Sequence, residues 1–135
     1  MNDSNKAITY CKKAVEVEPK SSEAYRNLGT VYLNAEDYRN ALSAYNKAIE
    51  NNPRDVEAYF NKGLCFEGML RFREAVESFT KAIELEPTGD AYANRGLCRE
   101  GTQEIELALK DYEHALLLDP HNSLAKERKK ILTGK

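Results

Sequence analysis

The sequence predicts an all-α fold in which antiparallel helix pairs stack into a solenoid. The four prolines, Pro19, Pro53, Pro87 and Pro120, stand 34, 34 and 33 residues apart, and a period of this length is typical of repeat architectures. Apolar residues within each period follow helical spacing, and no long alternating run supports a strand. The 135 residues, of which 41% are hydrophobic, suffice for one domain with a buried core.

Equivalent residues recur through three periods. They are Tyr25, Tyr59 and Tyr92; Asn27, Asn61 and Asn94; Gly29, Gly63 and Gly96; Ala41, Ala75 and Ala108; Tyr45, Phe79 and Tyr112; and Ala48, Ala82 and Ala115. From Ala75 to Ile83 the apolar residues are spaced i, i+1, i+4, i+7 and i+8, which draws one stripe along a helix. The pattern predicts helices over 22–34, 38–51, 56–68, 72–85, 89–101 and 105–118.

The first helix of each repeat contains a glycine, and the second helix ends before a proline. Proline cannot continue a helix, and it restrains the residue before it. Each internal glycine costs about 1 kcal/mol relative to alanine. We expect close packing of the two helices of a repeat to offset this cost. The expected small facing partners are Ala41, Ala75 and Ala108.

The two ends of the chain differ from the three repeats. Residues 5–19 predict a lone second helix of a partial repeat, with an apolar stripe from Ala7 to Val15 that we expect to be uncovered. That is typical of a piece of a longer array, or of a contact surface for another copy or chain. Residues 123–133 predict a polar capping helix anchored by Leu124 and Ile131. The predicted single domain thus comprises 5–19, repeats at 22–55, 56–88 and 89–120, and the cap.

These residues resemble the tetratricopeptide repeat, whose hallmark is a Trp/Tyr, Leu-Gly, Tyr, Ala, aromatic, Ala, Pro progression. The first repeat matches throughout, with Tyr25, Leu28, Gly29, Tyr32, Ala41, Tyr45, Ala48 and Pro53. The second matches nearly as well, whereas the third has Arg99 where an aromatic residue is expected. The resemblance implies a right-handed superhelix whose first helices line a concave groove.

The sequence offers little material for catalysis. Its two histidines, His114 and His121, have no Cys, Asp or Glu at metal-ligand spacing. We interpret Cys11, Cys65 and Cys98 as small buried hydrophobic residues. We therefore predict no enzymatic activity, no metal and no cofactor.

Composition also bears on the compartment and the class of partner. An odd cysteine count without a signal sequence indicates the cytoplasm or another reducing intracellular compartment. No apolar run is long enough for membrane insertion. A net charge of −2 argues against a strongly basic nucleic-acid binder.

The resemblance implies that the outward residues of the first helices bind an extended segment of another protein. The predicted groove residues are Arg26, Asn27, Thr30, Glu57, Phe60, Asn61, Leu64, Asp90, Asn94 and Leu97. The three asparagines look similar to the asparagine ladder in the repeat array of O-GlcNAc transferase and related scaffolds, which hold peptides largely independently of sequence. An amide side chain can both donate to and accept from a peptide backbone.

The charges of the groove predict the character of the ligand. An apolar floor is expected from Phe60, Leu64, Ala93 and Leu97. The expected acids are Glu23, Glu57, Glu67, Asp90 and Glu100, with Arg26 as the single base. This balance favours a ligand with apolar anchors and Lys or Arg flanks.

Several alternatives stay open at this point. Co-chaperone members of the family hold acidic Glu-Glu-Val-Asp tails with a Lys, Asn, Asn, Lys, Arg clamp. The five clamp positions correspond in this chain to Arg26, Thr30, Asn61, Asp90 and Asn94. Only Asn61 is identical to the clamp residue, and Arg26 is a conservative replacement of lysine. The chain could also recruit substrates for a larger enzyme, or self-assemble through residues 5–19. Residues 123–135 hold five basic residues against one acid, which indicates a solvated cap, an acidic partner, or weak contact with nucleic acid or anionic membrane.

Overall fold

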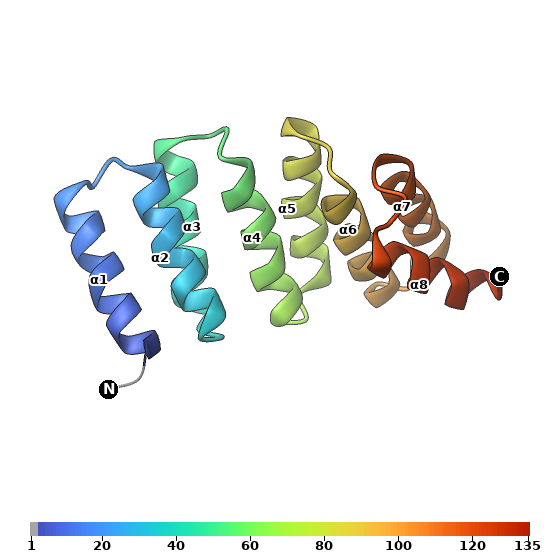
Figure 1. Cartoon of the computed structure of the whole chain (residues 1–135), viewed down its shortest axis with the longest axis horizontal. Helices are drawn as coiled ribbons and strands as arrows, with labels where there is room; N and C mark the ends of the chain where they lie inside the picture. Colours follow the sequence, from blue (N-terminus) through green and yellow to red (C-terminus); the bar gives the residue numbers. More distant parts are fainter. Residues whose placement is uncertain (1–2) are drawn as a thin grey trace.

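A computed structural model describes residues 3–135, which form a right-handed α-solenoid of eight helices without strands (Figure 1). The helices are α1 (Asp3–Val17), α2 (Ser22–Asn34), α3 (Tyr38–Asn51), α4 (Val56–Gly68), α5 (Phe72–Leu85), α6 (Gly89–Gly101), α7 (Ile105–Leu118) and α8 (Ser123–Thr133). Helices α2 to α7 occupy the six ranges that the periodicity predicts. None of the helices in the described range is long and apolar enough to cross a membrane.

The helices pack with their neighbours in the chain. Helices α2 and α3, α4 and α5, and α6 and α7 form the three pairs, while α3–α4 and α5–α6 contacts join successive pairs. Helix α1 packs on α2 and helix α8 on α7, so the two termini lie at opposite ends of the stack (Figure 1). Each helix therefore buries its apolar side mainly against its immediate neighbours, as expected of a solenoid.

Local side-chain chemistry fixes where the helices begin and end. The side chains of Ser21, Asp37, Asp55, Thr88 and Asn122 each accept a hydrogen bond from a backbone N–H three residues later, at the starts of α2, α3, α4, α6 and α8. The second helices end in an extended residue before the proline, with φ of −145°, −155° and −143° at Asn52, Glu86 and Asp119.

The internal glycines of the first helices meet aromatic rings. A Cβ atom on Gly29, Gly63 or Gly96 would lie 2.6–2.7 Å from the nearest ring carbon, on Tyr45, Phe79 and Tyr112 respectively. The expectation of close helix packing is confirmed, and the atoms nearest to the glycines belong to these rings rather than to the expected alanines. A flat ring rests directly on the bare backbone of each glycine, and this contact sets the distance between the paired helices.

The third repeat replaces apolar packing with a buried ion cluster. Asp111 of α7 is only 2% exposed. It accepts hydrogen bonds from Arg95 Nε at 3.0 Å, Arg95 Nη2 at 2.8 Å and Arg99 Nη1 at 3.0 Å. Arg95 Nη1 also donates to Thr80 Oγ1 on α5 at 3.0 Å. Arg99 thus fills the expected aromatic place as part of a network that ties α5, α6 and α7 together.

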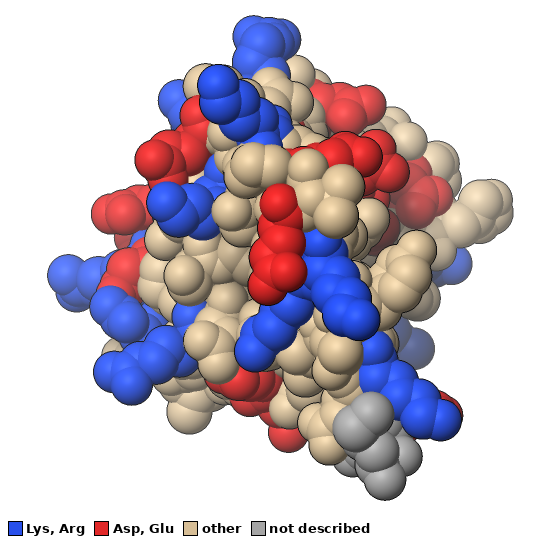
Figure 2. All heavy atoms as spheres, turned by 90° about the vertical axis from the view of Figure 1, so that its left-hand side faces the viewer, with Lys and Arg blue, Asp and Glu red and all other residues tan. Residues whose placement is uncertain are grey.

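The apolar stripe of α1 is covered rather than exposed, contrary to the expectation. Cys11 is buried, and Ile8 and Val15 pack against the same core cluster, because α2 lies on this side of α1. The exposed large apolar side chains of α1 are Tyr10 and Val17. Viewed onto this end, the molecule carries Lys and Arg together with Asp and Glu, and neither sign dominates (Figure 2). Self-association through residues 5–19 stays a prediction.

Helix α8 is anchored by Leu124, as expected, but not by Ile131. Ala125 is fully buried, and Leu124 and Leu132 pack beside it. Ile131 is 57% exposed, so its expected role as an anchor is wrong. Leu132, one residue further along the helix, is partly buried against the core instead.

Candidate functional site

The cap residues Ser21, Asp55, Thr88 and Asn122 put α2, α4, α6 and α8 in a common register. The sixth residue after the cap is Asn27, Asn61, Asn94 and Arg128 in turn, and the ninth is Thr30, Leu64, Leu97 and Ile131. We call the side of the four helices that carries these two rows the groove face. The sequence prediction of the groove left out its fourth helix, α8. Asn122 was the signal, because it is a typical cap residue at the repeat spacing.

The three asparagines of the groove face are differently engaged. Asn27 is exposed and makes no side-chain hydrogen bond to another described residue. Asn94 Nδ2 donates to the backbone oxygen of Asp90 at 2.8 Å. Asn61 lies beside the hydroxyl of Tyr45, which is also 3.0 Å from Thr30 Oγ1. Burial raises the pKa of Tyr45 to about 12 despite these two hydrogen-bonding neighbours, so this hydroxyl stays neutral.

A pocket of about 450 Å³ lies on the groove face between α4 and α6. It is lined by Val56, Glu57, Phe60, Ala82, Glu86, Thr88, Asp90 and Ala91. The pocket brings together three of the predicted residues, Glu57, Phe60 and Asp90. The ring of Phe60 meets Phe79 edge to face, with centroids 5.4 Å apart, which holds it in place. Glu86 was missed because it caps α5, outside the first helices on which the prediction concentrated.

The apolar floor of the groove is narrower than expected. Ala93 is only 1% exposed and belongs to the core cluster around Tyr112, so its expected place in the floor is wrong. Phe60 and Leu64 are half-buried and pack against the cluster around Phe79. The apolar surface left for a ligand therefore centres on Phe60, Leu64 and Leu97.

Arg26 is engaged by carboxylates of the next repeat. Its Nη1 lies 2.9 Å from Asp55 Oδ2, and its Nε lies 2.7 Å from Glu57 Oε2. Asp55 is buried and also accepts from Ser22 Oγ at 2.6 Å. The single base expected in the groove thus serves as a link between α2 and α4, and its charge is already neutralised.

Two of the expected groove acids are also held inside the molecule. Glu100 accepts hydrogen bonds from Arg128, through Nε at 3.0 Å, and from the hydroxyl of Tyr112. The hydrogen bond from Arg128 is the main reason why the pKa of Glu100 lies below its usual value. Glu67 lies 3.6 Å from the thiol of Cys98, and burial raises the pKa of Glu67.

The remaining acids surround the pocket and its approach. Asp90 accepts from Asn122 Nδ2 at 2.9 Å, which leaves its second carboxylate oxygen available. Glu23 and Glu86 are exposed, and Glu57 is exposed while one of its carboxylate oxygens pairs with Arg26. Glu23 and Asn27 line a second hollow of about 610 Å³ between α1 and α2. The accessible charge of the groove face between α2 and α6 is therefore negative.

Family models for the tetratricopeptide repeat match residues 22–55 and 56–88, and a second set matches residues 1–21 and 89–122. The chain belongs to the tetratricopeptide repeat (TPR) family. A search of curated proteins finds no match.

Solved structures of other TPR proteins are similar to this chain. The TPR domain of Arabidopsis OM64 is 30% identical, with a TM-score of 0.82, over 84% of this chain and 95% of that one. MamA is 32% identical, with a TM-score of 0.79, over 95% of this chain and 66% of that one. The first TPR domain of Spaghetti (RPAP3), bound to the HSP90 peptide SRMEEVD, is 25% identical, with a TM-score of 0.81, over 84% and 91%. This TPR chain is accordingly a protein–protein interaction module.

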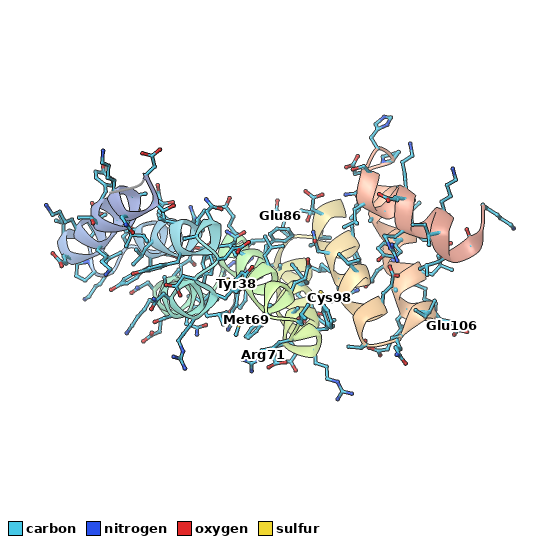
Figure 3. All side chains as sticks on the ribbon, turned by 90° about the horizontal axis from the view of Figure 1, so that it is seen from below. Tyr38, Met69, Arg71, Glu86, Cys98 and Glu106 are labelled. Carbon is cyan, nitrogen blue, oxygen red and sulfur yellow. The ribbon has the colours of Figure 1, made fainter. Side chains whose placement is uncertain are left out.

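The reactive side chains of this TPR module are placed for packing. Cys11, Cys65 and Cys98 are free and buried, and Figure 3 places Cys98 among the side chains within the stack. Burial raises the pKa of Cys65 to about 12, which keeps it a thiol. His114 stacks on Tyr92, with ring centroids 5.1 Å apart. Between residues 3 and 135, no three His, Cys, Asp or Glu side chains form a metal-binding group.

Proposed function

We propose that this TPR module binds an extended segment of another protein along the groove face, with an apolar anchor at Phe60 and Lys or Arg flanks. The pocket between α4 and α6 carries the proposal. Its floor includes Phe60, and its rim holds the carboxylates of Glu57, Glu86 and Asp90. A positively charged side chain beside an apolar anchor complements such a pocket.

In this proposal the row of asparagines supplies contacts to the peptide backbone that do not depend on the sequence of the peptide. Asn27, Asn61 and Asn94 stand at the same place in successive repeats. Each hydrogen bond contributes about 0.5–1.5 kcal/mol net. Three such bonds together with one apolar anchor suit micromolar rather than nanomolar affinity.

An acidic ligand is the alternative, because the Spaghetti relative binds the HSP90 peptide SRMEEVD. The charges on the groove face argue against it here. Arg26 is occupied by Asp55 and Glu57. Asp90 brings a carboxylate to a place where the clamp has a lysine. An acidic tail would meet repulsion there and lacks a free basic partner.

The same holds when the clamp is shifted by one repeat toward the C-terminus. Its places then fall on Phe60, Leu64, Asn94, Leu124 and Arg128. Only the third and fifth of these places, Asn94 and Arg128, have suitable side chains. Arg128 is already paired with Glu100. Both registers therefore favour a basic and apolar segment over an acidic one.

Fluorescence anisotropy with two labelled peptides tests the proposal. One peptide has a central Phe or Leu flanked by Lys and Arg, and the other ends in Glu-Glu-Val-Asp. The basic peptide should bind more tightly, and Glu86→Gln should weaken it about threefold, because one exposed charge contributes about 0.2–1 kcal/mol. Glu84→Gln is the matched control, since Glu84 is also exposed on α5 but does not line the pocket. Tighter binding of the acidic peptide would contradict the proposal.

A further inference from the structure

Helix α8 presents a face that second helices cover in the three full repeats. We call it the α8 outer face, and it consists of Lys126, Lys129, Lys130 and Thr133, the fourth, seventh, eighth and eleventh residues after the cap. In the full repeats the eighth residue is the glycine that touches the aromatic ring of the second helix. Lys130 takes that place on α8. The α8 outer face therefore lies where the other first helices contact a second helix, but it is positively charged rather than apolar.

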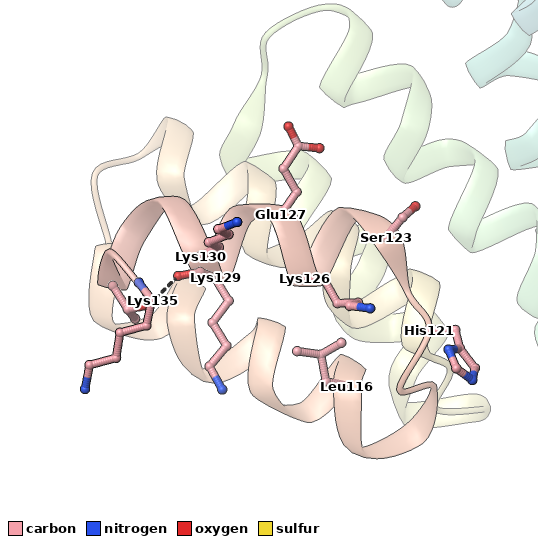
Figure 4. A pocket seen from close by; sticks show the side chains of 9 residues that line it. Leu116, His121, Ser123, Lys126, Glu127, Lys129, Lys130 and Lys135 are labelled. Carbon is pink, nitrogen blue, oxygen red and sulfur yellow. Dashed lines mark hydrogen bonds between the residues drawn. The ribbon is translucent and has the colours of Figure 1, made fainter.

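A pocket of about 970 Å³ lies along this face, between α8 and the end of α7 (Figure 4). It is lined by Leu116, His121, Ser123, Lys126, Glu127, Lys129, Lys130, Thr133 and Lys135. The lining contains four lysines and one glutamate, so its net charge is positive. Lys129 Nζ lies 4.0 Å from Glu113, and the other three lysines have no ion-pair partner within residues 3–135. Leu116 supplies an apolar patch from α7.

We propose that the α8 outer face docks an acidic amphipathic helix of a partner protein, at a site separate from the groove face. The residues of the α8 outer face are at the positions through which the other first helices contact their second helices. Those second helices are 14 residues long. A helix with carboxylates at i, i+3, i+4 and i+7 would place them against the lysines. An apolar residue at the border of that stripe would contact Leu116. Opposite charge supplies both attraction and register.

A second copy of the chain is a poorer occupant. Helix α1 carries the exposed lysines Lys6, Lys12 and Lys13. Among the described residues, the α1 end of the molecule shows no excess of acidic side chains that would attract the lysines of α8 (Figure 2). A head-to-tail stack would bring these lysines toward those of α8. Like charges in apposition disfavour such a contact.

Titration of the whole chain with a designed peptide tests this proposal. The peptide is a 14-residue helix, the length of α7, with glutamates on one stripe and leucines beside it. A scrambled peptide of the same composition is its control. Saturable binding of the designed peptide, weakened about tenfold in Lys126→Glu/Lys130→Glu, supports the proposal. Lys12→Glu/Lys13→Glu is the matched control at the other end and should bind as the unmodified chain does.

A charge-swapped pair keeps the test independent of folding defects. A peptide with lysines in place of the glutamates should bind Lys126→Glu/Lys130→Glu better than it binds the unmodified chain. Circular dichroism spectra should be the same for all variants. The basic groove peptide should not displace the acidic helix, because the two sites lie on different faces.

Three results would overturn the proposal. Equal binding of the scrambled peptide would mean that only net charge is recognised. Equal weakening by the two double variants would place the contact elsewhere. Tighter binding of duplex DNA or anionic phosphatidylserine vesicles than of the helix, lost in Lys126→Glu/Lys130→Glu, would assign the face to a phosphate surface instead.

Discussion

At the residue scale, the contact between a glycine and an aromatic ring sets how closely each helix pair packs. Gly63 lies in the middle of α4, where a glycine costs about 1 kcal/mol relative to alanine. The ring of Phe79 occupies the space that a Cβ atom would need. Phe79 is itself fully buried, so its ring cannot simply swing out into solvent. Packing thus outweighs helix propensity at this position.

We predict that Gly63→Ala destabilises the protein, although alanine is the better helix former. The new Cβ would lie 2.6 Å from Cε1 of Phe79. Overpacking of this kind costs about 1–3 kcal/mol and exceeds the gain in propensity. Urea unfolding measures the difference.

A double-mutant cycle identifies the cause. Phe79→Leu removes the ring, so Gly63→Ala should cost less in that background. An equal cost of Gly63→Ala with and without the ring would show that the contact with Phe79 is not responsible.

At the scale of a helical repeat, the ion cluster of the third repeat replaces the apolar packing of the first. Leu28, Tyr32 and Ala44 of the first repeat correspond to Arg95, Arg99 and Asp111 of the third. Considered alone, Arg99 is a mismatch to the repeat pattern, which has an aromatic residue at this position. Its partner could have been found from the sequence, because all three positions depart from the pattern together. The added bond to Thr80 could not, since it depends on how α5 lies against α6.

We predict that Asp111→Ala destabilises the protein by about 3–5 kcal/mol, because two partly buried guanidinium groups lose their carboxylate. The triple variant Arg95→Leu/Arg99→Tyr/Asp111→Ala should recover most of this loss. It restores the residues of the first repeat, and well-packed apolar groups can replace a buried ion cluster without loss. Thermal and urea unfolding of the variants check this. A triple variant less stable than the single one would contradict it.

Helix α8 is joined to α6 and α7 through Glu100, Tyr112 and Arg128. Because the pKa of Glu100 is lowered in the folded state, its contribution to stability is present above its ordinary pKa of 4.5. The contribution is lost as the pH falls through the folded-state pKa.

We therefore predict that Glu100→Gln lowers the free energy of unfolding by about 1–2 kcal/mol at neutral pH, because it removes charged hydrogen bonds. The difference from the unmodified chain should shrink as the pH falls below 4.5 and through the lowered folded-state pKa, because Glu100 becomes protonated. Urea unfolding across this pH range measures the change. Glu106→Gln, at an exposed glutamate of α7 outside the network, is the control. A difference that persists unchanged at low pH would contradict the assignment.

At the scale of the whole molecule, the sequence period determined the fold because neighbouring helices make most of the contacts. Proline spacing, glycine placement and the apolar stripe are all local, so helix ranges and family followed from them. The groove was harder to predict. Whether Arg26 or Glu100 is free for a ligand depends on Asp55 at the start of α4 and on Arg128 of α8, each two helices further along the chain. Such pairings arise only once the repeats stack.

The structure consequently brings some of the predicted groove residues together and removes others from the accessible surface. Glu57, Phe60 and Asp90 meet in one pocket. Ala93 is buried and Arg26 is neutralised. The part of the groove face on α8 was overlooked because α8 carries an arginine, Arg128, where the other three helices carry an asparagine.

The most direct test of the proposed function is an NMR titration of the ¹⁵N-labelled chain with the basic and apolar peptide. We predict that the side-chain amide signals of Asn27, Asn61 and Asn94 shift, together with the backbone signals of the residues around Phe60. The Asn27→Ala/Asn61→Ala/Asn94→Ala variant should bind the same peptide more weakly. Shifts confined to α8, or to the outer sides of α3, α5 and α7, would contradict binding in the groove.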